Sequence, residues 1–256
     1  MSGYAPPSEV RHLRPRATGA TEAVILAGGL GTRLRPYTMV LPKPLIPVGD
    51  QPVLEHIIRR LAAAGLTRFH LCLGQRLGGL IETYLRHSAV LPRGVEIVCH
   101  WEDEPLGTAG ALRIVPGLDE SFLVMNGDIF TTLDYGELLR CHAETGADLT
   151  IAMRSEAVDI ALGVIECGDG RVTGYREKPS LTYEASMGVY VYKRTALELL
   201  PASGPCQFPE LVLRLIAAGR HVGAYRTDAV WYDIGTVAEY ERALSDVLER
   251  PDLFAA

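Results

Sequence analysis

The sequence predicts an α/β fold in which a doubly wound, mixed sheet forms a single domain. Strand-like and helix-like segments alternate over roughly the first 150 residues, as they do in proteins built on a largely parallel sheet. The expected strand 122–126 is continuously apolar until its last residue, as is typical of a parallel strand buried on both faces. Further along, hairpin-like strands surround Gly168-Asp169-Gly170 and would add antiparallel strands to the same sheet.

The first half of the chain supplies the expected parallel strands and their connecting helices. We expect strands at 22–27, 69–73, 94–101, 122–126 and 147–153, and helices at 51–64, 76–87, 108–115 and 135–145. The helix at 51–64 has its apolar residues at helical spacing on one side. Asp50 is suited to cap the start of this helix and Gly65 to end it.

The second half is expected to complete the sheet and close the domain. We expect a hairpin of 163–166 and 171–175, a strand at 186–192, helices at 194–200 and 209–218, strands at 222–226 and 229–232, and a closing helix at 236–249. Thr236 and Glu239 have the spacing of a capping box at the start of the last helix. The sequence therefore predicts one domain over 22–250, with a flexible N-terminal arm at 1–21 and a C-terminal tail at 251–256.

Composition excludes several classes of protein. The chain has 256 residues, of which 48% are hydrophobic and 22% charged, as is ordinary for a globular protein. Its formal net charge is −6 and it has no block of five Lys or Arg residues, so we expect no nucleic-acid partner. No apolar run is long enough to cross a membrane, and residues 1–21 lack the apolar core of a signal peptide. Five cysteines without a Cys-x-x-Cys pair suit a reducing compartment, so we expect a cytoplasmic location.

A glycine-rich turn followed by two cations is the most informative motif. The apolar run 23–26 leads into a turn with three glycines, Gly28, Gly29 and Gly31. Such a turn lets the backbone approach a ligand closely and can point several N–H groups at one anion. Arg33 follows the turn and Lys43 stands between two prolines, so the segment is suited to bind linked phosphates. It lacks the Gly-Lys-Ser/Thr of a Walker loop, and Leu34 replaces the third glycine of the dinucleotide fingerprint.

Residues 26–48 resemble the signature of the sugar-1-phosphate nucleotidylyltransferases, and the resemblance extends over roughly residues 22–249. Enzymes of this family join a sugar 1-phosphate to a nucleoside triphosphate and release pyrophosphate. The resemblance implies a Rossmann-like fold of the nucleotide-diphospho-sugar transferase type. It also implies that the glycine turn binds the nucleotide, through Leu26, Ala27, Gly28, Gly29, Gly31 and Thr32.

Two acidic residues are candidate metal ligands. Asp128 directly follows the apolar strand 122–126, at the strand end where open α/β sheets bind ligands. Asp233 lies in a segment that resembles the family's second acidic motif, Trp-x-Asp-x-Gly-Thr. The resemblance implies that both carboxylates hold one Mg²⁺, an ion that prefers one or two carboxylates together with phosphate oxygens and waters.

The reaction that the resemblance implies requires charge stabilisation rather than a general base. The attacking oxygen belongs to a sugar phosphate, which is already an anion, so the absence of a Ser/His/Asp arrangement is expected. Metal ions and cationic side chains can bring two polyanions together and stabilise the leaving pyrophosphate. We expect Arg33 to bind the departing phosphates and Lys43 to neutralise charge near the α-phosphate, with Asp128 as the third catalytic residue.

The sugar phosphate is expected to meet a second group of residues. Glu177-Lys178-Pro179 matches the family's Glu-Lys-Pro, in which the lysine binds the phosphate and the glutamate accepts from sugar hydroxyls. Gly163 matches a glycine that lines the sugar site, and Ser186 is placed to bond a hydroxyl. Leu162 stands where many relatives have an aromatic residue, so the identity of the sugar stays open.

The base is expected to be read by Glu102, which stands five residues before Gly107 and Thr108 in a segment that resembles the family's nucleobase site. An ionised carboxylate only accepts hydrogen bonds, and guanine offers two adjacent donors, so Glu102 favours GTP over UTP or dTTP. The segment is most similar to that of mannose-1-phosphate and heptose-1-phosphate guanylyltransferases.

Three alternatives follow from the same residues. The enzyme could instead use UTP or dTTP with glucose 1-phosphate. A non-catalytic homologue that only binds nucleotide sugars would be expected to lack Arg33, Lys43, Asp128 or Asp233, all of which are present. A dinucleotide-dependent oxidoreductase is disfavoured by Leu34. The expected partners are a nucleoside triphosphate and a sugar 1-phosphate, and the sequence leaves a homo-oligomer open.

Overall fold

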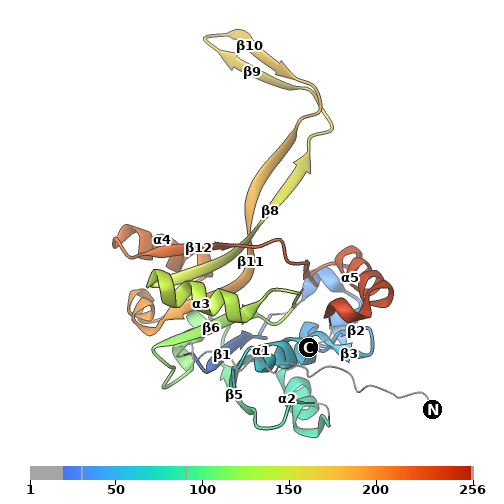
Figure 1. Cartoon of the computed structure of the whole chain (residues 1–256), viewed down its shortest axis with the longest axis vertical. Coiled ribbons are helices and arrows are strands. Elements are labelled where there is room, and N and C mark those ends of the chain that lie inside the picture. Colours follow the sequence, from blue (N-terminus) through green and yellow to red (C-terminus); the bar gives the residue numbers. More distant parts are fainter. Residues whose placement is uncertain (1–19, 30, 90, 255–256) are drawn as a thin grey trace, which may run out of the picture.

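A seven-stranded mixed sheet runs through the body of the protein (Figure 1). The computed structural model describes residues 20–29, 31–89 and 91–254, so most of the predicted arm 1–21 lies outside the described residues. The strands lie in the order β12 (Val222–Arg226), β8 (Leu149–Asp159), β11 (Ser180–Lys193), β6 (Ser121–Asn126), β1 (Glu22–Leu26), β4 (Arg68–Gly74) and β5 (Glu96–Glu102). Only β11 is antiparallel to its neighbours in this sheet. The predicted mixed α/β sheet is therefore confirmed.

Apolar clusters cover both faces of the sheet, which is what makes the fold doubly wound. The helices are α1 (Val53–Ala63), α2 (Gly78–His87), α3 (Tyr135–Thr145), α4 (Phe208–Ala217) and α5 (Val237–Glu249). Ile25 of β1 belongs to a buried cluster that includes residues of α1, α2 and α3. Val24, one position earlier, points to the other face and belongs to a cluster that includes Leu211 and Leu215 of α4. Alternate residues of one central strand thus hold helices on opposite sides.

Several connections are short 3-10 helices rather than α-helices. They span Thr32–Leu34, Tyr37–Met39, Lys43–Leu45, Gly110–Ile114, Arg194–Leu199 and Pro251–Phe254. The helices expected at 108–115 and 194–200 are among them. Among the described residues, no helix combines the length and apolar character needed to cross a membrane.

The capping predictions had mixed outcomes. Thr236 caps α5, because its hydroxyl accepts from the backbone N–H of Glu239 at 3.2 Å. Asp50 does not cap α1, contrary to the prediction. Strands β2 (Pro47–Val48) and β3 (Gln51–Pro52) form a two-stranded hairpin that places Asp50 in its turn, so α1 begins only after Pro52.

The segment predicted as a C-terminal tail is part of the fold over the residues that are described. Residues 251–254 form a 3-10 helix, and the Phe254 side chain is only 4% exposed. Its ring stacks on that of Phe130, with centroids 4.5 Å apart. Burial of this aromatic ring explains why the chain stays packed beyond residue 250.

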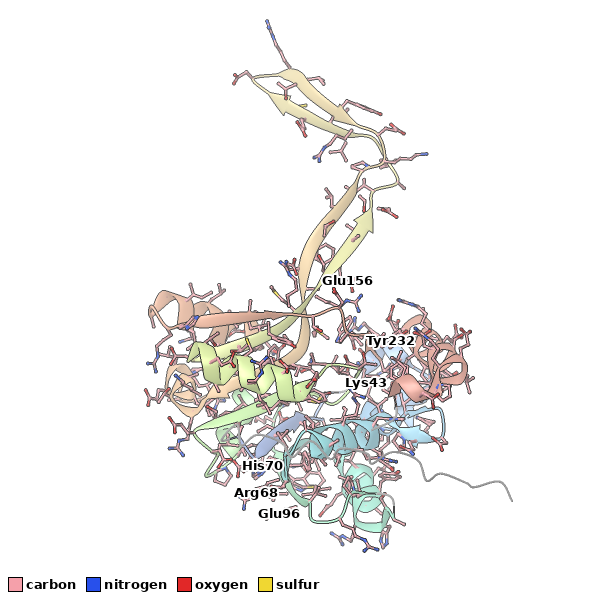
Figure 2. The ribbon with its side chains drawn as sticks, in the orientation of Figure 1. Lys43, Arg68, His70, Glu96, Glu156 and Tyr232 are labelled. Atoms are coloured by element: carbon pink, nitrogen blue, oxygen red, sulfur yellow. The ribbon has the colours of Figure 1, made fainter. Side chains whose placement is uncertain are left out.

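Strands β8 and β11 continue beyond the sheet as a paired ribbon that leaves the body (Figures 1 and 2). The predicted strands 147–153 and 186–192 cover only the inner parts of these elements. Residues 154–159 pair with 180–185, and beyond them β9 (Val164–Gly168) and β10 (Arg171–Arg176) form the predicted hairpin. We call residues 154–185 the projecting arm. Residues 180–185 alternate polar and apolar side chains, residues 154–159 are mostly polar, and neither strand has the continuous apolar run that marks a buried strand.

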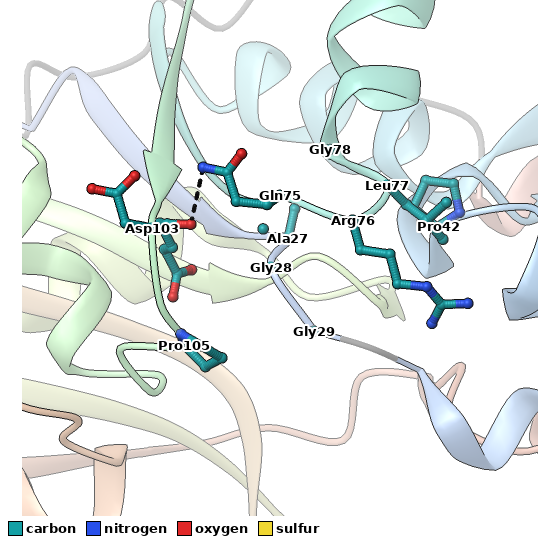
Figure 3. A pocket seen from close by; sticks show the side chains of 12 residues that line it. Ala27, Gly28, Gly29, Pro42, Gln75, Arg76, Leu77, Gly78, Asp103 and Pro105 are labelled. Carbon is teal, nitrogen blue, oxygen red and sulfur yellow. Dashed lines mark hydrogen bonds between the residues drawn. The ribbon is translucent and has the colours of Figure 1, made fainter.

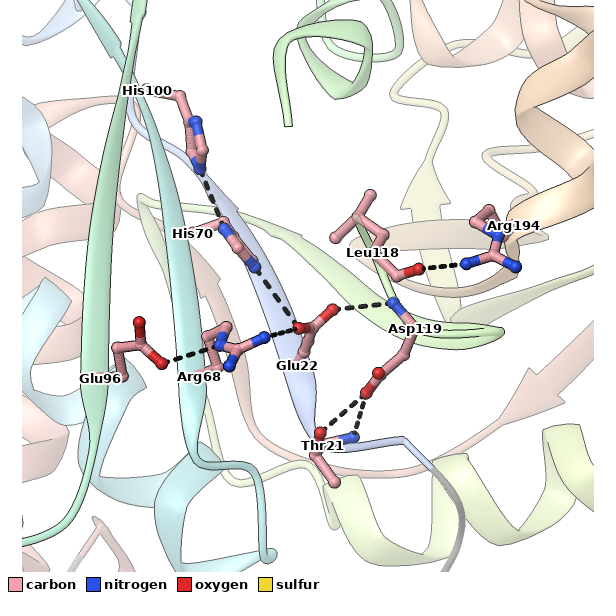
Figure 4. Close-up of polar contacts among 9 residues, drawn as sticks. All are labelled: Thr21, Glu22, Arg68, His70, Glu96, His100, Leu118, Asp119 and Arg194. Atoms are coloured by element: carbon pink, nitrogen blue, oxygen red, sulfur yellow. Dashed lines mark hydrogen bonds and ion pairs between the residues drawn. The ribbon is translucent and has the colours of Figure 1, made fainter. Parts of the chain in front are cut away.

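A polar network occupies the opposite end of the sheet from the strand ends that carry the predicted site residues (Figure 4). Glu22 is buried and pairs with Arg68 at 2.7 Å, and Arg68 also pairs with Glu96 at 2.8 Å. The rings of His70 and His100 are hydrogen-bonded at 2.9 Å. Burial lowers the pKa of both histidines, which fits a structural role in the neutral form.

Candidate active site

The carboxyl ends of four parallel strands surround a crevice. It consists of two adjoining cavities of about 310 and 260 Å³ that share a wall formed by Gly28, Gly29, Glu102 and Pro105. The last residue of each strand lines one or both cavities, namely Leu26 of β1, Gly74 of β4, Glu102 of β5 and Asn126 of β6. Figure 3 shows the first cavity, which lies between the glycine turn and the start of α2. This is the edge at which open α/β sheets bind ligands.

Most of the predicted nucleotide-binding residues line this crevice. They are Leu26, Ala27, Gly28, Gly29, Glu102, Gly107 and Thr108. Gly31 and Thr32 line neither cavity. Gly31 has a left-handed backbone with φ 63, and a Cβ there would lie 2.8 Å from the Thr38 side chain and 2.9 Å from that of Lys43. Its role is therefore to let Lys43 pass close to the turn.

Glu102 is held against the glycine turn. One of its carboxylate oxygens accepts from the backbone N–H of Leu106 at 2.9 Å. A Cβ on Gly28 would lie only 2.5 Å from the other oxygen, so a larger residue at position 28 would displace the carboxylate. Glu102 thus lines both cavities with an oriented carboxylate, as a base-reading residue requires.

Thr108 also has a structural role that the sequence did not indicate. Its hydroxyl accepts from the backbone N–H of Phe208, the first residue of α4, at 2.8 Å. The backbone of Gly107 passes so close to Cys206 that a Cβ would lie 2.6 Å from the Cys206 carbonyl oxygen. These contacts fix the start of α4 against the wall of the second cavity.

The two predicted metal ligands are neighbours, although more than a hundred residues separate them. Asp128 lies between β6 and the short strand β7 (Ile129–Thr131), which pairs with β13 (Trp231–Asp233). In this ladder Asp233 stands opposite Ile129, and the backbone N–H of Ile234 donates to the Asp128 carbonyl at 3.0 Å. Burial, and next the charge of Asp128, raise the pKa of Asp233. Two carboxylates that repel each other in this way suit a cation between them.

The two predicted cations lie beside these acids. The Lys43 ammonium is 2.7 Å from Oδ2 of Asp128, and both side chains are largely buried. The Arg33 guanidinium lies 3.9 Å from Asp233 and is 69% exposed, so it is free to meet a ligand. Among the described residues, no three His, Cys, Asp or Glu side chains are grouped to hold a metal. A Mg²⁺ ion held by Asp128 and Asp233 would need phosphate oxygens and waters as further ligands, which is the set it prefers.

The structure does not bring the predicted sugar-phosphate residues together. Ser186 lies at the root of the projecting arm, where Gly188 approaches Asn126 so closely that a Cβ would lie 2.8 Å from its amide nitrogen. Gly163, Glu177 and Lys178 lie midway along the arm, at the junction between its inner ribbon and the hairpin of β9 and β10. The reason is the paired extension of β8 and β11, which carries these three residues away from the crevice.

Sequence reasoning missed five polar residues that line the crevice: Gln75, Arg76, Asp103, Asn126 and Gln207. Gln75 and Arg76 directly follow β4, Asp103 directly follows β5, and Asn126 ends β6. The rule that singled out Asp128, a polar residue at the carboxyl end of a strand, would have found all four. Gln207 comes from another part of the chain and carried no such signal.

Comparison with known proteins assigns the chain to a family. The sequence profile of the nucleotidyl transferase family matches residues 22–250. The chain belongs to the nucleotidyl transferase family. A UTP–glucose-1-phosphate uridylyltransferase of Synechocystis is 30% identical over 90% of this chain and 64% of its own length. A mannose-1-phosphate guanylyltransferase of Mycobacterium tuberculosis is 31% identical over 91% of this chain and 66% of its own length. The chain therefore spans about two thirds of the length of these relatives.

Solved structures of this family share the fold. The crystal structure of HddC from Yersinia pseudotuberculosis superposes with a TM-score of 0.67 at 27% identity, covering 88% of this chain and 99% of that one. A putative glucose-1-phosphate thymidylyltransferase of Bacillus anthracis superposes with a TM-score of 0.69 at 25% identity, covering 88% of this chain and 94% of that one. Family membership and the nucleotidyltransferase fold predicted from the glycine turn are confirmed.

Proposed function

We propose that this protein is a sugar-1-phosphate nucleotidylyltransferase, which joins a sugar 1-phosphate to a nucleoside triphosphate and releases pyrophosphate. The observation that carries the proposal is the grouping of Lys43, Asp128, Asp233 and Arg33 beside a glycine-lined crevice. Two cations and two acids there suit a pair of highly charged reactants and a divalent ion. The cytoplasm, which the free cysteines suit, is the proposed location.

The chain's own residues do the work of binding and charge neutralisation. The glycine turn receives the triphosphate through backbone N–H groups. Lys43 neutralises charge near the α-phosphorus, where a sugar-phosphate oxygen attacks, and Arg33 binds the β- and γ-phosphates as they depart. Bound Mg²⁺, held by Asp128 and Asp233, would supply further neutralisation of the reacting phosphates. No side chain needs to remove a proton, because the attacking oxygen is already an anion.

GTP is the proposed nucleotide, and the orientation of Glu102 supports it. A carboxylate fixed beside Gly28 can accept from both N1–H and the N2 amino group of guanine. The similarity to a mannose-1-phosphate guanylyltransferase favours a manno-configured sugar. A UTP- or dTTP-dependent enzyme acting on glucose 1-phosphate is the second candidate, because the Synechocystis relative is a uridylyltransferase.

One assay tests these statements. Pyrophosphate release is measured with GTP, UTP, dTTP and ATP, each with mannose, heptose and glucose 1-phosphates, and with Mg²⁺ or EDTA. We expect turnover only with Mg²⁺ and highest turnover with GTP. A higher rate with UTP or dTTP would select the second candidate. No turnover with any pair, together with nucleotide-sugar binding in calorimetry, would identify a non-catalytic homologue instead.

A further inference from the structure

The projecting arm has an apolar face that nothing in the described chain covers. In the inner ribbon, Val158 stands opposite Leu181, and Tyr183 is on the same face, where it stands opposite Glu156. In the distal hairpin, Ile165 stands opposite Tyr175. These side chains are 40–60% exposed. Exposed apolar side chains on consecutive ladders of one ribbon indicate a surface that binds another protein.

The opposite faces of the arm are polar. Asp159 stands opposite Ser180 in the inner ribbon. In the distal hairpin Glu166 forms an ion pair with Arg176 at 3.3 Å. Figure 2 shows that the side chains of the arm point into open space on both sides of the ribbon. The arm is therefore amphipathic, like a strand pair that packs on something with one face and meets water with the other.

The root of the arm is fixed to the body. Arg226 of β12 pairs with Glu184 at 2.7 Å, and the Trp231 indole donates to the Met187 carbonyl at 2.8 Å. The backbone N–H of Thr227 donates to the Met153 carbonyl at 3.0 Å. These contacts fix the root of the arm relative to the body.

The length of the ribbon separates Lys178 from its own crevice. Ser186 at the root and Ser180 at the outer end are six residues apart, which corresponds to about 20 Å at about 3.3 Å per residue. Lys178 lies two residues beyond Ser180. Its backbone is left-handed, with φ 42. This conformation is uncommon for a residue with a side chain, and such residues cluster at functional sites. Lys178 forms no ion pair with any described residue, so its ammonium is available to a ligand elsewhere.

A second apolar surface lies on the body beside the crevice. Residues 37–41 connect Arg33 to Lys43, and four of these five residues have large apolar side chains that are 39–69% exposed: Tyr37, Met39, Val40 and Leu41. This surface is adjacent to the predicted phosphate site but is not covered by the arm of the same chain (Figure 1). It supplies a receiving surface for the arm of another copy.

We propose that two copies of this chain associate by exchanging their arms, so that the apolar face of each arm packs against residues 37–41 of the other copy. Glu177 and Lys178, midway along one arm, then complete the crevice of the other copy. The part assigned to Lys178 rests on the proposed function, because it supposes that the crevice takes a sugar phosphate. The association itself does not depend on that function.

The surface offered is large enough for a stable pair. The five apolar side chains on each arm, about half exposed, offer about 500 Å² if a large apolar side chain contributes about 150–250 Å². Two such arms contribute about 1,000 Å², and the surfaces that receive them add to this, so the total reaches the lower limit of about 1,200 Å² for specific, stable interfaces. A two-fold arrangement also uses each surface once per copy, so the assembly closes at two.

Complementation of two defective variants tests the shared site. Lys43→Met removes a cation of the body, and Lys178→Asn removes the cation of the arm with a residue that tolerates a left-handed backbone. If the arms are exchanged, each mixed dimer has one intact site, and the co-expressed pair recovers about a quarter of the wild-type rate. If each arm serves its own crevice, no mixed dimer has an intact site and the rate stays at that of the single variants, which overturns the proposal. Full activity of Lys178→Asn alone overturns it as well.

Oligomeric state tests the association without reference to catalysis. Light scattering after size exclusion is expected to give a dimer for the wild-type chain and a monomer for the double variant Val158→Ser/Tyr183→Ser. The matched control is Leu213→Ser on α4, which is 66% exposed and outside both surfaces, and which should remain dimeric. A wild-type monomer at all concentrations overturns the proposal. A dimer without any turnover would count against the proposed function and not against the exchange of arms.

Discussion

The Lys43 ammonium lies 2.7 Å from the carboxylate of Asp128, although 85 residues separate them in the sequence. The glycine at position 31 makes this approach possible, because a side chain there would collide with Lys43. The lysine thus joins the glycine turn to the acidic end of the crevice. It places one positive charge next to two carboxylates, Asp128 and Asp233, at the point where phosphates are proposed to react.

Lys43→Met is expected to lower kcat/KM for pyrophosphate release by about 10²–10³-fold, as removal of one preorganised charge stabiliser does in other enzymes. Lys43→Arg should not restore activity, because the planar guanidinium does not replace a compact ammonium in a tight site. Steady-state rates measure both effects. Lys193→Met is the matched control, since Lys193 bonds the Gly146 carbonyl far from the crevice. A rate for Lys43→Met within twofold of wild type would remove this lysine from the mechanism.

Asp128→Asn and Asp233→Asn are each expected to raise the Mg²⁺ concentration that gives half-maximal turnover. The double variant should be little worse than either single one, because residues that hold one ion act as a unit. A Mg²⁺ titration of the rate measures this. Asp228→Asn, which changes an exposed aspartate nearby in sequence, should leave the titration unchanged. Additive losses in the double variant would show that the two acids do not share an ion.

The sequence predicted those residues of the crevice that local sequence patterns can assign. An apolar strand followed by glycines, or by a carboxylate, places those residues at the ligand-binding edge whatever the rest of the chain does. For this reason Gly28, Gly29 and Asp128 could be assigned without a structure, and they line the crevice. Gln75 lies at the same edge, after Gly74 at the end of β4, and was missed because a single glycine followed by Gln75 and Arg76 matches neither the glycine-rich turn nor the acidic motif.

Long-range pairing could not be predicted in the same way. The short strand β7 has three residues and no periodic pattern, yet its pairing with β13 is what brings Asp128 beside Asp233. The outer parts of β8 and β11 are stabilised by each other and not by burial, so their hydrophobic pattern did not reveal how far the ribbon extends. This is why the sequence placed Lys178 in the crevice and the structure does not.

Glu102→Gln is expected to reduce the preference for GTP over UTP by about tenfold, because tenfold corresponds to about 1.4 kcal/mol and one mismatched polar contact costs about 1–3 kcal/mol. The glutamine can still accept from the backbone N–H of Leu106, so the loop should keep its conformation. Competition between the two nucleotides in the pyrophosphate assay measures the ratio. Glu104→Gln, at an exposed position two residues on, is the control. An unchanged ratio would contradict the assignment of Glu102 to the base.

His142 is expected to make the fold less stable in mild acid. Burial, and next the charge of Lys193, lower its pKa to about 4, whereas an unfolded histidine titrates near 6.5. Between these values the unfolded chain binds more protons, so the free energy of unfolding falls as the pH falls from about 6.5 to 4. Urea unfolding of wild type and His142→Gln across this range measures the effect. The variant should lose less stability than wild type, and parallel curves would contradict the prediction.

Phe254→Ala is expected to lower the free energy of unfolding by about 3 kcal/mol, because it leaves a cavity where a buried ring was packed. The ring is 4% exposed and stacks on Phe130, which itself contacts the ring of Tyr232 in β13. The loss should therefore also loosen the strand that ends in Asp233 and reduce turnover. Leu253→Ala removes a side chain that is 39% exposed and should cost much less. Equal midpoints for the two variants in urea unfolding would contradict this prediction, because the greater burial of Phe254 is the reason for expecting a larger loss of stability than at Leu253.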